Sequence, residues 1–109
     1  MLPTLNQEIH QLHSSLCYGL ADPTRILILY SLQDSPLNVT ELAAQLELPQ
    51  PTVSRHLKVL RERGMVIARR DAQSVYYSVA DERIMQALDL MRSVLADLLK
   101  DQASLVTQD

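Results

Sequence analysis

Apolar residues recur in the N-terminal part of the chain with the spacing of one helix face. They are separated by steps of three or four residues, which predicts an amphipathic helix. These residues are Leu5, Ile9, Leu12, Leu16 and Leu20. A second helix is predicted in the segment ADPTRILILYSLQ, where Asp22 can cap the helix and Pro23 can occupy its first turn. Its run from Ile26 to Tyr30 is apolar nearly all round, so we expect this helix at the centre of the core.

Two shorter helices follow, with only a few residues between them. Asn38 and Glu41 stand in the positions of a capping box and open a helix that ends before Pro49. The next helix has an apolar inner face and is expected to stop at Gly64. That inner face consists of Val53, Leu57 and Leu60. Two short helices joined by ELPQ have the lengths of a helix-turn-helix, which we place at about residues 38–63.

The periodicity changes after Gly64. MVIARR and SVYYSVA are rich in β-forming residues and are joined by a polar turn, which predicts a β-hairpin, or wing, at about residues 65–79. Two strands of this length are not stable alone, so the hairpin must pack on the helices. Tyr76 and Tyr77 must point to opposite faces of the second strand, and we expect Tyr77 in the core.

A last amphipathic helix is predicted at about residues 81–100, and the tail after it is expected to fray. Its apolar positions are Ile84, Leu88, Met91, Leu95 and Leu98. Together the elements predict a mostly α protein with a β-hairpin (α+β). This is a winged helix-turn-helix in a single domain that spans residues 1–109.

The composition is that of an ordinary globular protein, with 47% hydrophobic and 21% charged residues in 109 positions. No apolar run approaches the roughly 20 residues that cross a bilayer, and the N-terminus lacks the pattern of a signal peptide. The single cysteine, Cys17, excludes an intrachain disulfide and a Cys-rich zinc site within one chain. These features favour a cytoplasmic protein with no membrane partner.

Charge is segregated along the chain. The formal net charge is -3, yet residues 49–70 hold six of the ten basic residues and one of the thirteen acidic residues. A basic patch on a helix-turn-helix indicates a surface that neutralises the phosphates of nucleic acid. A solvated helix face without a partner is the plainer interpretation, but such faces seldom coincide with helix-turn-helix spacing.

The predicted contacts divide by position. Residues near the N-terminus of a recognition helix reach deepest into the major groove and can read base edges. These are Gln50, Thr52, Ser54, Arg55 and His56. Lys58, Arg61 and Arg63 are better placed for phosphates, while Arg69 and Arg70 lie in the wing with Gln73 and Tyr76 beside them.

Four segments in this order resemble the ArsR/SmtB family of small bacterial transcriptional repressors. They are LADPTRILILYSL, VTELAAQLEL, PTVSRHLKVLRERGMV and SVYYSV, and the resemblance spans residues 16–98. It implies a homodimer whose first and last helices form the interface, and which leaves a palindromic DNA operator when an inducer, commonly a metal ion, binds. Pro49 departs from the family, which usually has a serine before the recognition helix, so this helix should lack a side-chain cap.

The family's metal sites have no obvious ligands in this sequence. The positions of its paired cysteines match Asn38 and Thr40, neither of which is a soft ligand. Its second site takes Asp and His from the last helix, where this chain has no His. We therefore expect no metal or other cofactor, although His10 and His13 are spaced to share a helix face and remain an alternative zinc site.

Cys17 lies beside the apolar face of the first helix, and a small buried core residue is the expected role. A thiol-responsive repressor, with two copies of Cys17 meeting across the dimer, is the alternative. A module that contacts protein or RNA is another. An enzyme is not expected, because Ser54 and His56 diverge on a helix and no acid is spaced to orient the imidazole.

Overall fold

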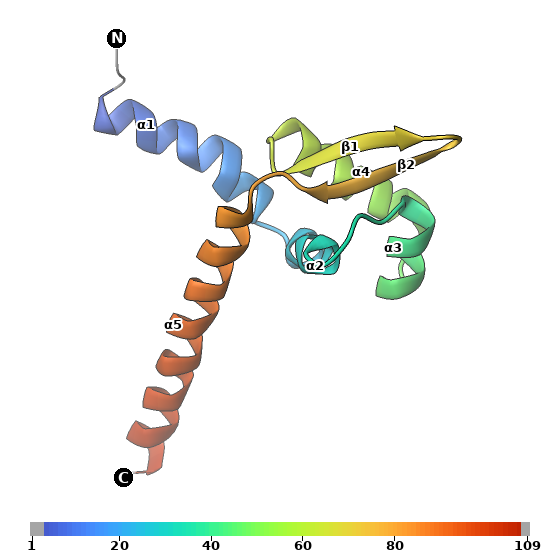
Figure 1. Ribbon diagram of the computed structural model, residues 1–109. Coiled ribbons are helices and arrows are strands. Elements are labelled where there is room, and N and C mark those ends of the chain that lie inside the picture. Colours follow the sequence, from blue (N-terminus) through green and yellow to red (C-terminus); the bar gives the residue numbers. More distant parts are fainter. Residues whose placement is uncertain (1–3, 108–109) are drawn as a thin grey trace.

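The computed structural model describes residues 4–107 and contains five α-helices and a two-stranded antiparallel hairpin (Figure 1). The elements are α1 (Leu5–Leu12), the π-helical turn η1 (His13–Cys17), α2 (Pro23–Leu32), α3 (Val39–Leu46), α4 (Gln50–Glu62), β1 (Val66–Asp71), β2 (Ser74–Val79) and α5 (Glu82–Thr107). Their order confirms the predicted winged helix-turn-helix.

The helix starts follow from local hydrogen bonds. Asp22 Oδ1 accepts a bond of 2.8 Å from the Thr24 amide, with Pro23 in the first turn of α2. Asn38 and Glu41 form the predicted capping box of α3, with bonds of 2.8 Å and 3.0 Å. At the start of α4, Pro49 provides no side-chain cap, as its chemistry requires.

The core lies between α2, α3, α4 and the hairpin. Ile28 and Leu29 of α2 are fully buried, which confirms the central position predicted for this helix. The remaining buried apolar residues are Leu32, Leu42, Ala43, Val53, Leu57, Leu60, Met65, Val66, Met85 and Leu88. Tyr77 packs against this core as predicted, and its backbone pairs with Leu37 through bonds of 2.8 Å and 3.1 Å. Gly64 ends the α4 segment at φ +75°, a conformation that favours glycine.

The first helical segment differs from the prediction of one regular helix. The π-helical turn η1 widens it between His13 and Cys17, and helical backbone resumes at Tyr18. No residue of α1 or η1 is buried. This segment and α5 extend away from the core in different directions (Figure 1).

The last helix is longer than predicted. It continues to Thr107, so the prediction of a frayed tail after residue 100 is wrong for residues 101–107. Its first turns pack on the core, and Tyr30 of α2 donates a bond of 2.6 Å to Asp89. From Asp89 to residue 102 every α5 side chain is exposed. The radius of gyration is 17.0 Å, against about 13 Å for a compact chain of this length.

A left-handed residue connects the two helices of the helix-turn-helix. Glu47 ends α3 at φ 56° and ψ 47°, a conformation that costs a side chain with a Cβ roughly 1–2 kcal/mol. We expect Glu47→Gly to raise the free energy of unfolding by up to about 1 kcal/mol, because glycine loses part of that gain to chain entropy. Chemical denaturation measures it. Gln45→Gly, in the regular part of α3, should instead lower stability by about 1 kcal/mol, and equal effects would contradict this explanation.

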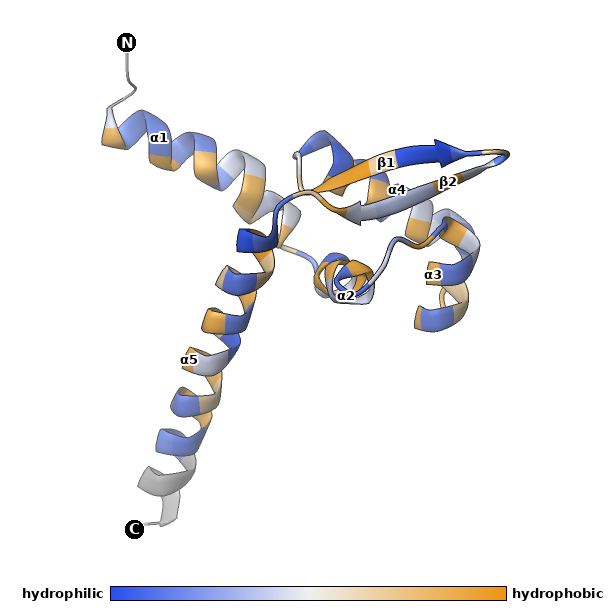
Figure 2. Cartoon of the chain, viewed as in Figure 1, coloured by the Kyte–Doolittle hydropathy of each residue, from blue (hydrophilic) through white to orange (hydrophobic). Residues whose placement is uncertain are grey.

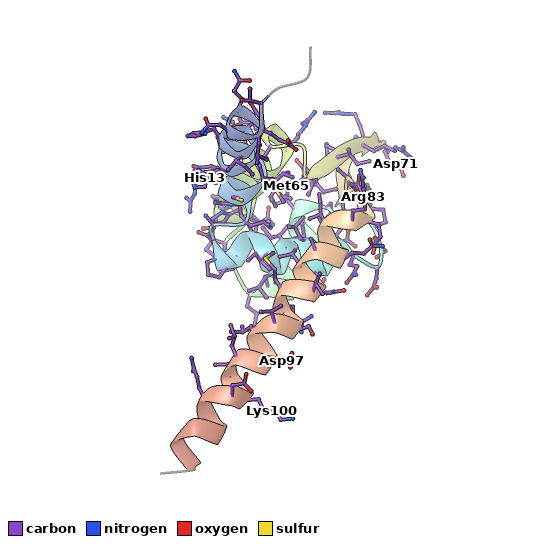
Figure 3. The ribbon with its side chains drawn as sticks, turned by 90° about the vertical axis from the view of Figure 1, so that its left-hand side faces the viewer. His13, Met65, Asp71, Arg83, Asp97 and Lys100 are labelled. Carbon is purple, nitrogen blue, oxygen red and sulfur yellow. The ribbon has the colours of Figure 1, made fainter. Side chains whose placement is uncertain are left out.

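The first turn of α5 is held by a charged residue just before it. Asp81 accepts a bond of 2.9 Å from the Arg83 amide, and its carboxylate lies 2.7 Å from the Arg83 guanidinium, labelled in Figure 3. The Arg83 side chain and then its amide lower the Asp81 pKa from 3.8 to about 2. A depressed pKa stabilises the folded state above pH 3.8, and that contribution is lost as the pH falls toward 2.

Asp81→Asn should therefore lower the melting temperature modestly at pH 6, and the difference should become much smaller as the pH falls to about 2. Melting curves of the two proteins between these pH values measure it. Asn preserves the cap while removing the charge, so a difference that is constant across this range would contradict the charge-based explanation.

Candidate nucleic-acid interface

The helix α4 has one face in the core and one face in solvent. Val53, Leu57 and Leu60 are buried against α2 and α3, as their spacing predicted. The opposite side carries exposed polar and basic side chains within one arc of the helix. They are Gln50, Ser54, Arg55, Lys58 and Arg61. Thr52 is half-buried beside this arc. In Figure 2 the visible turns of α4 carry both hydrophilic and hydrophobic residues.

Within the described part of the chain, the cations on this outer face have no acidic partner. Among the described residues, the ion pairs are Arg83 with Asp81 and Arg92 with Asp89, both on α5 or beside it. Arg55, Lys58 and Arg61 take part in neither. Their charges are therefore solvated and available to an anionic ligand.

The hairpin places its two arginines on opposite faces. Arg69 pairs with Tyr76 and Arg70 with Val75 in the antiparallel register. Because side chains alternate along a strand, Arg69 and Tyr76 share the outer face, whereas Arg70 shares the face of Tyr77. Arg69 and Arg70 are exposed, as is Gln73 in the two-residue turn. The outer face also holds a shallow hollow of about 420 Å³, lined by Pro36, Ile67, Arg69, Asp71, Tyr76 and Ser78.

The structure does not bring His56 to the outer face. Its side chain is 8% exposed, and its Nδ1 lies 3.3 Å from Nη1 of the buried Arg25. The prediction that His56 reads a base is therefore wrong in this structure. The side chain packs inside the protein, against Arg25. Arg63 is likewise not on the outer face, because it is half-buried and its guanidinium lies 4.6 Å from the centre of the Tyr18 ring. The sequence analysis did not identify Arg25 as a residue of interest. It lies in a helix whose other inward positions are apolar, and nothing in its spacing indicates a buried polar contact.

The structure also corrects the expectation for Cys17, which is exposed. It borders two hollows, of about 380 Å³ toward α5 and about 500 Å³ toward His13 and Arg63. His10 and His13 are exposed on the first helical segment. Across residues 4–107, no three His, Cys, Asp or Glu side chains come together as a metal site within one chain. No helix in that range is long and apolar enough to span a membrane.

Comparison with known proteins agrees with this arrangement. The model of the arsR family of bacterial regulatory proteins matches residues 22–68. The transcriptional regulator NmtR of Mycobacterium tuberculosis is 40% identical over 87 residues, which cover 80% of this chain and 72% of that protein. The chain belongs to the ArsR family. The nodulation protein NolR of Rhizobium meliloti is 33% identical over 96 residues, covering 88% of this chain and 79% of that protein.

Solved structures extend the similarity of this ArsR-family chain to three dimensions. NolR from Sinorhizobium fredii superposes with a TM-score of 0.73 at 33% identity, over 86% of this chain and 96% of that one. The homodimeric winged helix-turn-helix DNA-binding domain of a Mycobacterium bovis protein superposes with a TM-score of 0.74 at 26% identity, over 89% of each chain. The winged-helix fold is thereby confirmed.

Proposed function

We propose that this ArsR-family regulator is a homodimeric repressor that binds a palindromic site in duplex DNA. The observation that carries the proposal is the outer face of α4, where Arg55, Lys58 and Arg61 are exposed and unpaired beside Ser54 and Gln50. In this assignment Gln50, Thr52, Ser54 and Arg55 read base edges in the major groove. Lys58 and Arg61 neutralise phosphates, and the wing residues Arg69, Arg70, Gln73 and Tyr76 contact the flanking backbone.

The homodimer is supported by apolar side chains that the single chain leaves in solvent. The first helical segment exposes Leu5, Ile9, Leu12 and Leu16, and α5 exposes Leu90, Met91, Val94, Leu95, Leu98 and Leu99. Soluble proteins rarely leave such continuous stripes uncovered. A second copy of the chain would cover them and would place two α4 helices about 34 Å apart, or a multiple of that, on one side of the duplex.

The test is fluorescence anisotropy of the purified protein with its own upstream DNA, as a function of salt. Four phosphate contacts in each protomer, from Lys58, Arg61, Arg69 and Arg70, predict a slope of log affinity against log salt near -7. A scrambled duplex should bind at least about 1,000-fold more weakly. Equal affinity for scrambled DNA or for the RNA duplex of the same sequence would contradict the proposal.

The inducer is tested in the same assay. Binding is measured under reducing conditions, with oxidant, with polysulfide and with Zn²⁺, each for the natural chain and for Cys17→Ser. Release that disappears in Cys17→Ser would support a thiol-responsive repressor. Release by Zn²⁺ would support a zinc site at His10 and His13. Both are exposed, and a second copy of the chain could supply acidic ligands.

A further inference from the structure

Arg25 is a buried cation that forms no ion pair with a carboxylate among the described residues. The Asp22 carboxylate, whose pKa is lowered most by its hydrogen bond to a backbone amide of α2, nevertheless lies near enough for both His56 and Arg25 to contribute to that lowering. Its side chain is 8% exposed, and the ion pairs of that range do not include it. Buried charges are normally paired with an acid, because desolvation is costly. All three guanidinium nitrogens of Arg25 instead point at neutral acceptors: Nε donates to Gly19 O at 2.8 Å, Nη2 to Tyr18 O at 2.9 Å, and Nη1 lies 3.3 Å from His56 Nδ1.

The chemistry of the guanidinium determines the direction of its contact with His56. A guanidinium has five N–H donors and no acceptor, and it does not lose its proton in proteins. In the 3.3 Å contact between these two groups, Nη1 is therefore the donor and His56 Nδ1 the acceptor. One side chain of α2 thus joins the backbone that follows η1 to the inner side of α4.

Two further contacts hold the same backbone against the helix-turn-helix. The Tyr18 ring lies 4.6 Å from the Arg63 guanidinium at the end of α4, and 5.5 Å from that of Arg25. Gly19 is buried, and a Cβ there would collide with Sδ of Met65, so the chain passes closely over the start of the wing. Figure 3 labels Met65 beside the first helical segment.

The position of these contacts along the chain suggests their role. They begin directly after Cys17, where the segment that exposes Leu5, Ile9, Leu12 and Leu16 ends. They finish in the middle and at the end of α4, behind the face that carries Arg55 and Lys58. A tilt of the first helical segment would therefore be resisted by, or passed on to, α4 through these buried and partly buried hydrogen bonds, because close-packed interiors do not deform freely.

We propose that Arg25 and His56 are positioning residues, which fix the angle between the dimer-forming helical segment and α4 and so set the separation of the two α4 helices. This inference rests on the proposed DNA-binding homodimer. It adds a specificity determinant that does not touch DNA, since His56 would act on the operator through the orientation of its helix.

The first experiment measures that separation directly. A spin label at Glu62→Cys, in a Cys17→Ser background, reports the distance between the two α4 helices of the dimer by pulsed electron resonance. Glu62 is exposed at the end of α4 and is not among the proposed DNA contacts.

We expect His56→Leu and Arg25→Gln to shift or broaden the distance distribution. His56→Asn, whose amide oxygen can replace Nδ1 as acceptor, should restore it. Arg92→Gln, which removes an arginine stacked on Tyr30 instead, is the matched control.

The second experiment measures operator binding by the same variants without the label. His56→Leu should lower operator affinity by about 10-fold or more, the size of one lost base contact, with the salt slope unchanged. A slope smaller by about 2 would mean that the two His56 side chains contact phosphates, and would overturn the proposal. An unaltered distance distribution in folded His56→Leu and Arg25→Gln would overturn it as well.

If the chain were not a DNA-binding homodimer at all, the experiments would give a different result from a failure of the positioning role alone. They would show no dipolar signal between protomers in the labelled parent protein, or no preference of that protein for its operator. Folding of each variant is checked by its circular dichroism and melting temperature. If His56→Leu does not fold, the comparison of Arg25→Gln with Arg92→Gln decides the outcome.

Discussion

Leu98→Glu should convert the dimer into monomers and abolish operator binding at concentrations where the natural protein is saturated. Leu98 lies on the apolar stripe of α5 and is 54% exposed in the single chain. A carboxylate buried in a dimer contact without a partner costs several kcal/mol, so the dimer dissociation constant should rise by about 100-fold or more. Sedimentation equilibrium and DNA anisotropy, measured on the same samples, test this.

Ser93→Glu is the matched control for that experiment. It adds the same charge to the same helix, about 140° around the axis from Leu98. It should leave both the dimer and operator affinity within about threefold of the natural protein, because surface substitutions have small effects. Dimers that persist in Leu98→Glu, or that dissociate equally in Ser93→Glu, would contradict an interface on this stripe of α5.

Arg55→Ala should have the largest effect among the proposed DNA contacts. A bidentate contact to guanine contributes roughly 1–3 kcal/mol of discrimination, and a symmetric dimer loses it twice. We therefore expect operator affinity to fall by roughly 30-fold to 20,000-fold, with relaxed preference at one base pair of each half-site. Anisotropy against a set of operators changed at single base pairs measures both effects.

Two other variants show whether Arg55 reads a base. Lys58→Ala should weaken all sequences about equally and should reduce the salt slope by about 2 in the dimer. Arg83→Ala removes an exposed arginine of α5 that is already paired with Asp81, just before that helix. It should leave operator binding unchanged. If Arg55→Ala behaves like Lys58→Ala, then Arg55 contacts phosphate instead of a base edge.

The elements of this fold could be predicted because each has a strong local signal. The three-four spacing of Val53, Leu57 and Leu60, and the capping pair Asn38 and Glu41, act within a few residues of themselves. The wing was predicted because the spacing of apolar residues changes after Gly64 from a helical to a strand-like pattern. Such signals need no knowledge of which distant segments come into contact.

The corrected residues depended on contacts between distant segments. His56 was expected at the DNA because it is polar, yet it stands four residues before Leu60 and three after Val53, which places it on the inner side of α4. A polar residue can stay buried only if it finds a partner, and Arg25 is 31 positions away. The spacing of His56 from Val53 and Leu60 indicated that His56 is buried. The sequence did not indicate that Arg25 would be its partner.

The other differences have similar causes. A π-helical turn arises from a local insertion into helical hydrogen bonding, which the apolar spacing of Leu12 and Leu16 does not reveal. The last helix continues beyond residue 100 because the chain has no Gly or Pro after Gly64 and Pro51 to stop it. Cys17 was expected in the core because it lies beside the apolar face of the first helix, but that face is exposed in the single chain.

In the proposed dimer, the long overhang of α5 would make the survival of the chain depend on its own concentration. After the contacts of Asp89 and Arg92 with Tyr30, the described α5 side chains as far as residue 102 are exposed in the single chain, and an isolated helix of that length is marginal in water. Its stability would then be linked to dimerisation by mass action, so that a chain without a partner would open this helix more often and expose it to proteases. Scarce chains would be removed and paired chains spared, which sets a floor on the concentration at which the regulator persists.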